Sequence, residues 1–160
     1  MKGWFSPKFV SESAIDYSPY LMMPNDLNAR NTIFGGRILA IADLTAAYAA
    51  LRHGNRDCVT LLMDRCKFLA PARQGEILVF KASVNRVWRS SMEVGVKVLA
   101  ENHFTRESRH IFSSYFTLVA LDENEKPTKI RQVIPETEDQ KRRYEEAEKR
   151  RNNRLSEKRL

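Results

Sequence analysis

The sequence predicts an α+β domain in which one antiparallel β-sheet packs on a single long helix. The first observation is the apolar segment from Ile38 to Leu51, which is rich in Ala and Leu, contains no Pro or Gly, and is typical of a core helix. The second is that the hydrophobic period changes to two after this segment, over four stretches joined by short turns. A long helix followed by a run of hairpin-connected strands is the α+β layout.

The elements before the sheet can be assigned in order. Ala14 to Met23 is predicted as a weak strand ended by Pro24, and Asn25 to Thr32 is rich in turn-forming residues. Gly35-Gly36 opens the helix, which runs to about His53, and Gly54-Asn55 is its stop signal.

Four strands are predicted after the helix. In Glu76 to Trp88 and in the strand that follows Arg89-Ser90-Ser91, apolar residues alternate with polar ones. Ile111 to Leu121 is apolar on both faces, which predicts a central position. The first strand of the four is Cys58 to Leu69. Because one helix covers only one face of a sheet, we expect a partner subunit to cover part of the other face, and exposed strand edges favour pairing between subunits.

Length and charge define the broad class. The chain has 160 residues, enough for one core, and a net charge of +7. We expect one domain over residues 1–135 and a charged helical tail over residues 136–160. From Glu138 to Leu160 the tail holds nine Lys or Arg and six Asp or Glu, a mixture typical of a solvated helix with i to i+4 pairs. The open alternative is contact with an anion.

Cysteine and histidine positions indicate the compartment and argue against metal. Cys58 and Cys66 lie on one predicted strand, roughly 26 Å apart at ~3.3 Å per residue, so they do not bridge each other. Free thiols of this kind suit a reducing compartment, and no segment is long and apolar enough to span a membrane, so we expect a cytoplasmic protein. The three histidines are scattered, and no metal site is predicted.

Asp43 is the only charged residue between Ile38 and Leu51. A carboxylate in an apolar setting is costly unless it is neutralised, hydrogen-bonded or used in chemistry, and burial would bring its pKa nearer neutral. The alternative is a carboxylate that reaches water at the edge of the helix.

Asn28, Gly35 and Asp43 form a spaced constellation around the start of the helix. The free N–H groups and the positive dipole end at Gly35-Gly36 can hold an oxygen that becomes negative. Asp43 lies about 12 Å further along the helix, too far to serve the same reacting carbon. The carboxylate that meets this glycine amide should therefore come from another subunit, with two equivalent sites in a dimer interface.

Five segments carry a family resemblance: D-L-N-A-R-N-T-I-F-G-G-R-I-L-A-I-A-D, C-V-T, C-K-F-L-A-P-A, R-S-S-M and S-S-Y-F-T-L-V-A-L-D. From about Met23 to Asp122 the chain resembles the hotdog-fold acyl-CoA thioesterases, and most of all the bacterial short acyl-CoA hydrolases and the cytosolic brain-type hydrolase. The resemblance implies a hotdog fold, Asn28 and Asp43 as catalytic residues from opposite subunits, Gly35 as amide donor to the thioester oxygen, and a trimer of dimers. Phe34 stands where many relatives have His.

The function implied is hydrolysis of acyl-CoA to a free acid and coenzyme A, with no cofactor apart from the coenzyme A of the substrate. Asp43 would act as general base or as nucleophile, and Asn28 would orient water or substrate. Further substrate-binding candidates are Gly36 and Thr60 in the site and Arg89, Ser90 and Ser91 for the phosphates of coenzyme A, with Arg86, Arg106 and Arg109 behind them.

Three other functions are alternatives to hydrolysis. A non-catalytic acyl-CoA sensor is the main alternative, although a sensor needs neither Asn28 nor Asp43. A hotdog dehydratase would need a His with an acidic partner near the helix, and none is placed there. Nucleic-acid binding through the basic tail is disfavoured because the tail mixes both charge signs.

Overall fold

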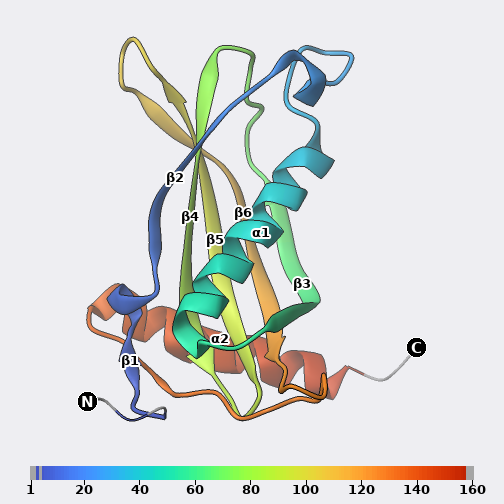
Figure 1. The fold of residues 1–160 in the computed structure, drawn as a ribbon. Helices are drawn as coiled ribbons and strands as arrows, with labels where there is room; N and C mark the ends of the chain where they lie inside the picture. The colour runs from blue at the N-terminus through green and yellow to red at the C-terminus, as the bar shows by residue number, and fades with distance from the viewer. Residues whose placement is uncertain (1–2, 4, 158–160) are drawn as a thin grey trace.

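The computed structural model, which describes residue 3 and residues 5–157, has a curved antiparallel sheet around one long helix, as predicted. Helix α1 (Gly35–Gly54) lies in the hollow of the sheet (Figure 1). The strand order is β2-β4-β5-β6-β3. The strands are β2 (Ile15–Leu21), β3 (Cys58–Phe68), β4 (Glu76–Val87), β5 (Ser91–Asn102) and β6 (Ser108–Ala120).

Short elements complete the fold. β1 (Lys8–Phe9) pairs in parallel with β7 (Val133–Ile134), and this small sheet has no counterpart in the sequence prediction. Single 3-10 turns lie at Val10–Glu12 and Pro24–Asp26.

The core lies between α1 and the concave face of the sheet. The alternation predicted for β4 is confirmed, since Leu78, Phe80 and Val84 are fully buried. The helix turns small residues toward the sheet, so that backbone and strands approach closely: Ala42, Ala46, Ala49 and Ala50 are fully buried. The predicted stop is also confirmed, because Asn55 caps the helix in the left-handed region with φ of 50°.

The position predicted for the last long strand is only partly right. β6 is an interior strand, between β5 and β3, but the middle strand of the sheet is β5. Both faces of β6 are covered, because α1 packs on one side and Arg150 of helix α2 (Glu138–Ser156) lies over Tyr115 on the other. An apolar double face therefore reflects coverage on both sides rather than a central place in the strand order.

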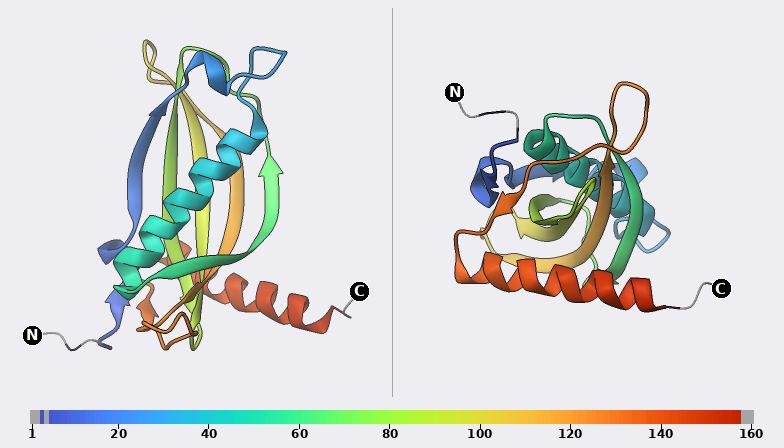
Figure 2. Two further views of the ribbon diagram at one scale, coloured as in Figure 1. Left: turned by 45° about the vertical axis from the view of Figure 1, so that its right-hand side comes forward. Right: turned by 90° about the horizontal axis from the view of Figure 1, so that it is seen from below.

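α2 crosses the outer face of the sheet (Figure 2). Its helical state is confirmed, but the expectation of a fully solvated tail is wrong, because Ala147 and Arg150 are buried. The chain's own helix thus covers part of the outer face that was expected to need a partner subunit.

An ion pair fastens α2 to the sheet. Arg150 donates from Nε and Nη2 to Glu93 of β5 at 3.0 and 2.6 Å, and its guanidinium carbon lies 3.6 Å from the centroid of the Tyr115 ring. Glu93 has no exposed surface and also accepts from Asn85 Nδ2 at 3.0 Å. A buried carboxylate and guanidinium are tolerated here because each is hydrogen-bonded to the other.

Among the described residues, neither helix combines the length and the apolar character that crossing a bilayer requires.

Candidate functional site

Asp43 lies in the middle of α1 and is hydrogen-bonded to β3. Its Oδ1 accepts from the Thr60 hydroxyl at 2.6 Å. The carboxylate is half-buried, so it is neither sealed in the core nor free in water. Two residues that are 17 positions apart in the sequence are thereby joined, and Thr60 fixes the orientation of the carboxylate.

The surface around this pair is apolar and exposed. β3 is an edge strand, so one side of its backbone has no partner strand among residues 5–157. Six large apolar residues of α1 and β3 are 38 to 70% exposed: Leu44, Tyr48, Leu51, Val59, Leu61 and Met63. Exposed apolar residues beside an open strand edge are typical of a subunit interface.

The N-terminus of α1 presents free backbone donors. Phe34 is the N-cap but makes no side-chain cap. Within the described part of the chain, no acceptor is bonded to the N–H groups of Gly35 and Gly36. These groups, at the positive end of a helix of 20 residues, suit an oxyanion.

Packing also explains the two glycines. A Cβ at Gly36 would lie 2.4 Å from the Phe34 ring, and one at Gly35 would lie 3.2 Å from the Phe68 ring. Two aromatic rings therefore pack directly on the helix start, and any side chain at Gly36 would displace Phe34.

Asn28 lies in the exposed loop before α1, and its side chain is already engaged in that loop. Its Oδ1 accepts from the N–H of Arg30 at 2.8 Å and of Thr32 at 3.3 Å, while its Nδ2 donates to Thr32 Oγ1 at 2.9 Å. Asn31 completes the turn in the left-handed region, with φ of 57°. The amide is held rigidly at the same end of α1 as Gly35.

Asp26 holds this loop and was missed in the sequence prediction. It is buried, and it accepts from the Tyr20 hydroxyl and the Met23 N–H at 2.8 Å each and pairs with Arg37 Nε at 2.8 Å. Burial alone would raise the pKa of Asp26, but the hydrogen bonds from Met23 and Tyr20 and the Arg37 charge lower it overall. The only sequence signal was its place at the start of the D-L-N segment.

Within one protomer, the predicted catalytic residues and Thr60 therefore lie in two separate groups. Asn28 and Gly35 lie at the N-terminal end of α1, whereas Asp43 and Thr60 lie together further down the helix. Eight residues of helix separate Gly35 from Asp43 by about 12 Å.

The coenzyme A candidates of the β4–β5 turn lie at the Thr60 end of the sheet. Met92, next to Ser91, pairs with Leu118, and Leu118 pairs with Thr60, which places the turn roughly 10 Å across the sheet from Thr60. Ser91 Oγ accepts from Arg151 of α2 at 3.4 Å, and the carbonyl of Ser90 accepts from Ala120 N–H at 2.9 Å.

The arginine candidates differ in how they are engaged. Arg89 is exposed, and its carbonyl accepts from Ile130 N–H at 2.9 Å; its guanidinium has no ion pair or hydrogen bond with any residue that the structure describes. Arg86 pairs with Glu148 of α2 at 2.8 Å, and Arg109 pairs with Glu76 at 2.5 Å. Arg106 is exposed at the β5–β6 hairpin. Arg86 and Arg109 thus hold the fold together, and Arg89 and Arg106 remain open to a ligand.

Other titratable groups have structural roles. Burial lowers the pKa of His53 to about 4, although its hydrogen bond with the Arg131 carbonyl opposes the shift. Burial and the nearby Asp57 carboxylate raise the pKa of Cys58 to about 11, so this thiol stays protonated near neutral pH.

Comparisons with known proteins agree with this fold. The model of the thioesterase superfamily matches residues 30–104. The uncharacterized acyl-CoA thioester hydrolase YkhA of Bacillus subtilis is 40% identical over 152 residues, covering 95% of this chain and 88% of that protein.

Two solved structures are similar over most of the chain. An apo hexameric acyl-CoA thioesterase has a TM-score of 0.91 at 39% identity, covering 94% of this chain and 96% of that one. The acyl-CoA hydrolase of Staphylococcus aureus, in complex with butyryl coenzyme A, coenzyme A and coenzyme A disulfide, has a TM-score of 0.88 at 36% identity, covering 93% and 90%. The chain belongs to the thioesterase superfamily and has its hotdog fold.

Proposed function

We propose that this protein hydrolyses acyl-CoA thioesters to a free carboxylic acid and coenzyme A. The observation that carries the proposal is the half-buried Asp43 held by Thr60, on the same helix whose N-terminus presents the free N–H groups of Gly35 and Gly36. A carboxylate and an oxyanion site are what thioester hydrolysis requires. The similarity to YkhA and to the S. aureus hydrolase supports the choice of acyl-CoA as substrate class.

In the proposed reaction the acyl carbonyl oxygen accepts from the Gly35 or Gly36 N–H, and Asn28 orients the water or the substrate. Asp43 either takes a proton from water as water attacks the carbonyl carbon, or attacks that carbon itself and forms an anhydride that water then opens. The C–S bond breaks in both routes, and the thiolate of coenzyme A receives a proton. Thr60 keeps one carboxylate oxygen of Asp43 fixed, and the other oxygen acts.

The separation of about 12 Å between Gly35 and Asp43 supports a site shared by two subunits. The exposed apolar residues of α1 and β3 support a dimer built through these elements, with the sheets joined edge to edge at β3. The hexameric relative supports a trimer of such dimers.

Coenzyme A brings phosphates to the mouth of the site, and Arg89 is our first candidate for them, with Ser90 beside it. No cofactor takes part in the proposed reaction, because coenzyme A enters with the substrate and leaves as product. The free thiols of Cys58 and Cys66 support a reducing compartment such as the cytoplasm.

The test is release of free thiol from a series of acyl-CoAs from acetyl to palmitoyl, with wild type and Asp43→Asn. We expect turnover of part of the series by wild type and at least ~100-fold less by the variant. Binding of acyl-CoA without turnover by wild type would contradict hydrolysis and identify a non-catalytic acyl-CoA-binding protein.

A further inference from the structure

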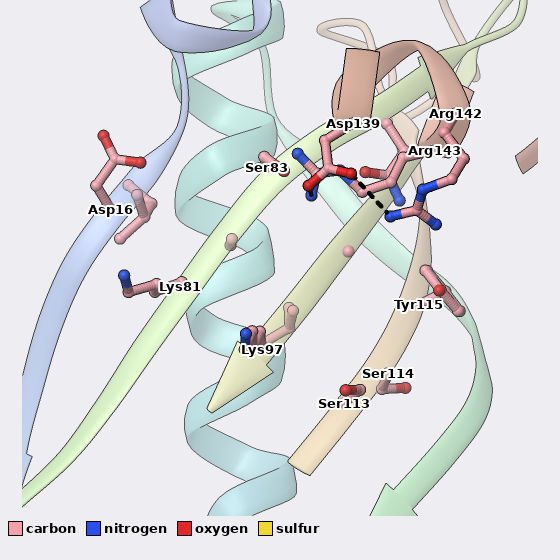
Figure 3. Close-up of a pocket in the computed structure, with 15 residues that line it drawn as sticks. Asp16, Lys81, Ser83, Lys97, Ser113, Ser114, Tyr115, Asp139, Arg142 and Arg143 are labelled. Carbon is pink, nitrogen blue, oxygen red and sulfur yellow. Dashed lines mark hydrogen bonds and ion pairs between the residues drawn. The ribbon is translucent and has the colours of Figure 1, made fainter. Parts of the chain in front are cut away.

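A pocket on the outer face of the sheet, beside the start of α2, belongs to neither group of proposed catalytic residues. It has a volume of about 440 Å³, within the range of small-ligand sites. Its floor comes from β4, β5 and β6 and its wall from the first turns of α2 (Figure 3). Asp43 and Thr60 lie with α1 on the opposite face, so the two sites of one protomer are separated by the sheet.

Two lysines of adjacent strands line this pocket. Lys81 of β4 pairs directly with Lys97 of β5 in the sheet register, and Ser113 of β6 is next in the same row. Neither lysine has an ion pair or a side-chain hydrogen bond with any described residue. Like charges directly opposite each other on adjacent strands destabilise a sheet, and a bound anion would remove this cost.

Further cations face the same space from α2. Arg143 is half-buried, and its contact with Asp139 is long, at 4.0 Å. Arg142 pairs with Asp139 at 3.4 Å and, more closely, with Glu146 at 3.1 Å. With Asp16 the lining therefore has four cationic and two acidic side chains, a net positive charge that suits a doubly charged anion.

The inner wall of the pocket contains an unpaired acceptor. Asn85 is 3% exposed, and its Oδ1 has no hydrogen-bond partner in the described structure, while its Nδ2 is fixed on Glu93. Gly95 lies beside it, and a Cβ there would lie 2.9 Å from Asn85 Nδ2. Gly95 thus leaves room for the Asn85 amide, whose Oδ1 the protein itself leaves unsatisfied, which points to a ligand that also carries an N–H or O–H donor.

We propose that the outer-face pocket binds a small phosphate compound, with Lys81 and Lys97 contacting the phosphate dianion and Arg143 closing over it. A phosphate monoester matches both the charge and the pocket volume, and the hydroxyls of Ser83 and Ser113 add donors along the floor. Inorganic phosphate and an organic monophosphate share this chemistry, and titration distinguishes them.

The test is calorimetric titration of the full-length protein with inorganic phosphate, AMP and adenosine, in the presence of excess coenzyme A. We expect AMP or phosphate to bind and adenosine not to bind. The variant Lys81→Gln/Lys97→Gln should weaken that binding at least ~10-fold, and a matched variant with the same loss of charge outside the pocket, Lys126→Gln/Lys149→Gln, should change it less than about 2-fold. Tighter binding of AMP than of phosphate would indicate an organic ligand, and equal binding would indicate the free ion.

Four results would overturn the proposal. They are no binding of phosphate or AMP by wild type up to about 1 mM, equal binding of adenosine and AMP, the same loss in both double variants, and a raised KM for acyl-CoA in Lys81→Gln/Lys97→Gln. The last would assign the lysines to the coenzyme A of the substrate instead. If wild type binds neither phosphate nor AMP, and Lys81→Gln/Lys97→Gln also dissociates a hexamer that wild type forms, the lysines would be assigned to a subunit contact.

Discussion

The ion pair between Glu93 and Arg150 should dominate the attachment of α2 to the sheet. Arg150 is 5% exposed and Glu93 is fully buried, and two hydrogen bonds of 2.6 and 3.0 Å join them. Arg150→Met leaves a carboxylate buried without its counter-charge, and removal of one partner of such a pair costs about 3–5 kcal/mol. For a chain of this size that lowers the melting temperature by about 6–20 °C.

A double-mutant cycle tests this. We expect Glu93→Met/Arg150→Met to be less destabilised than either single variant, because no unpaired charge remains in the interface. Lys149→Met, at an exposed position of the same helix, is the control and should leave the unfolding midpoint unchanged. Urea unfolding at fixed protein concentration measures the free energy of unfolding of the two single variants, the double variant and the control. Additive losses, or a loss below about 1 kcal/mol in Arg150→Met, would refute the assignment.

Three further predictions follow from the site and the core. Thr60→Val should lower kcat about 10-fold with little change in KM, because the carboxylate of Asp43 loses its positioning hydrogen bond; an unchanged kcat in thiol-release assays would contradict that role. Arg89→Gln should raise the KM for acyl-CoA and leave kcat near wild type. A lowered kcat with an unchanged KM would show that Arg89 does not contact the phosphates of coenzyme A. The pKa of His53 is lowered from 6.5 to about 4, so as the pH falls the unfolded chain binds the proton before the folded chain does. The contribution of His53 to the free energy of unfolding is therefore complete above pH ~6.5 and falls by up to ~3 kcal/mol toward pH 4. His53→Gln should flatten this slope in urea titrations, and an equal slope in the variant would show that other groups cause it.

The elements predicted from sequence are those whose signal is local. The apolar run from Ile38 to Leu51 and the stop signal at Gly54-Asn55 specify α1, and the alternation in β4 specifies which face is buried, so both match the structure within a few residues. Asp43 stands out for the same reason, as a single charge in an apolar helix.

The parts that sequence reasoning missed depend on contacts between distant residues. Nothing in the charged tail distinguishes Arg150 from its neighbours, and its partner Glu93 lies 57 residues away. The contact of Asp26 with Arg37, and the outer-face pocket that joins three strands to α2, likewise arise only when the chain has folded. Whether a charged side chain is buried depends on a partner from a distant part of the chain, and a hydrophobic pattern of period two or 3.6 does not reveal that partner.

The shared site is the central claim, and subunit complementation tests it most directly. Asp43→Asn and Asn28→Ala should each be inactive alone. In a mixed dimer one site would contain both intact residues and the other site neither, so an equimolar exchanged mixture should regain about a quarter of wild-type thiol release. Mass spectrometry of the intact assemblies would verify that mixed dimers form. An exchanged mixture as inactive as its parents would contradict a site built from two subunits.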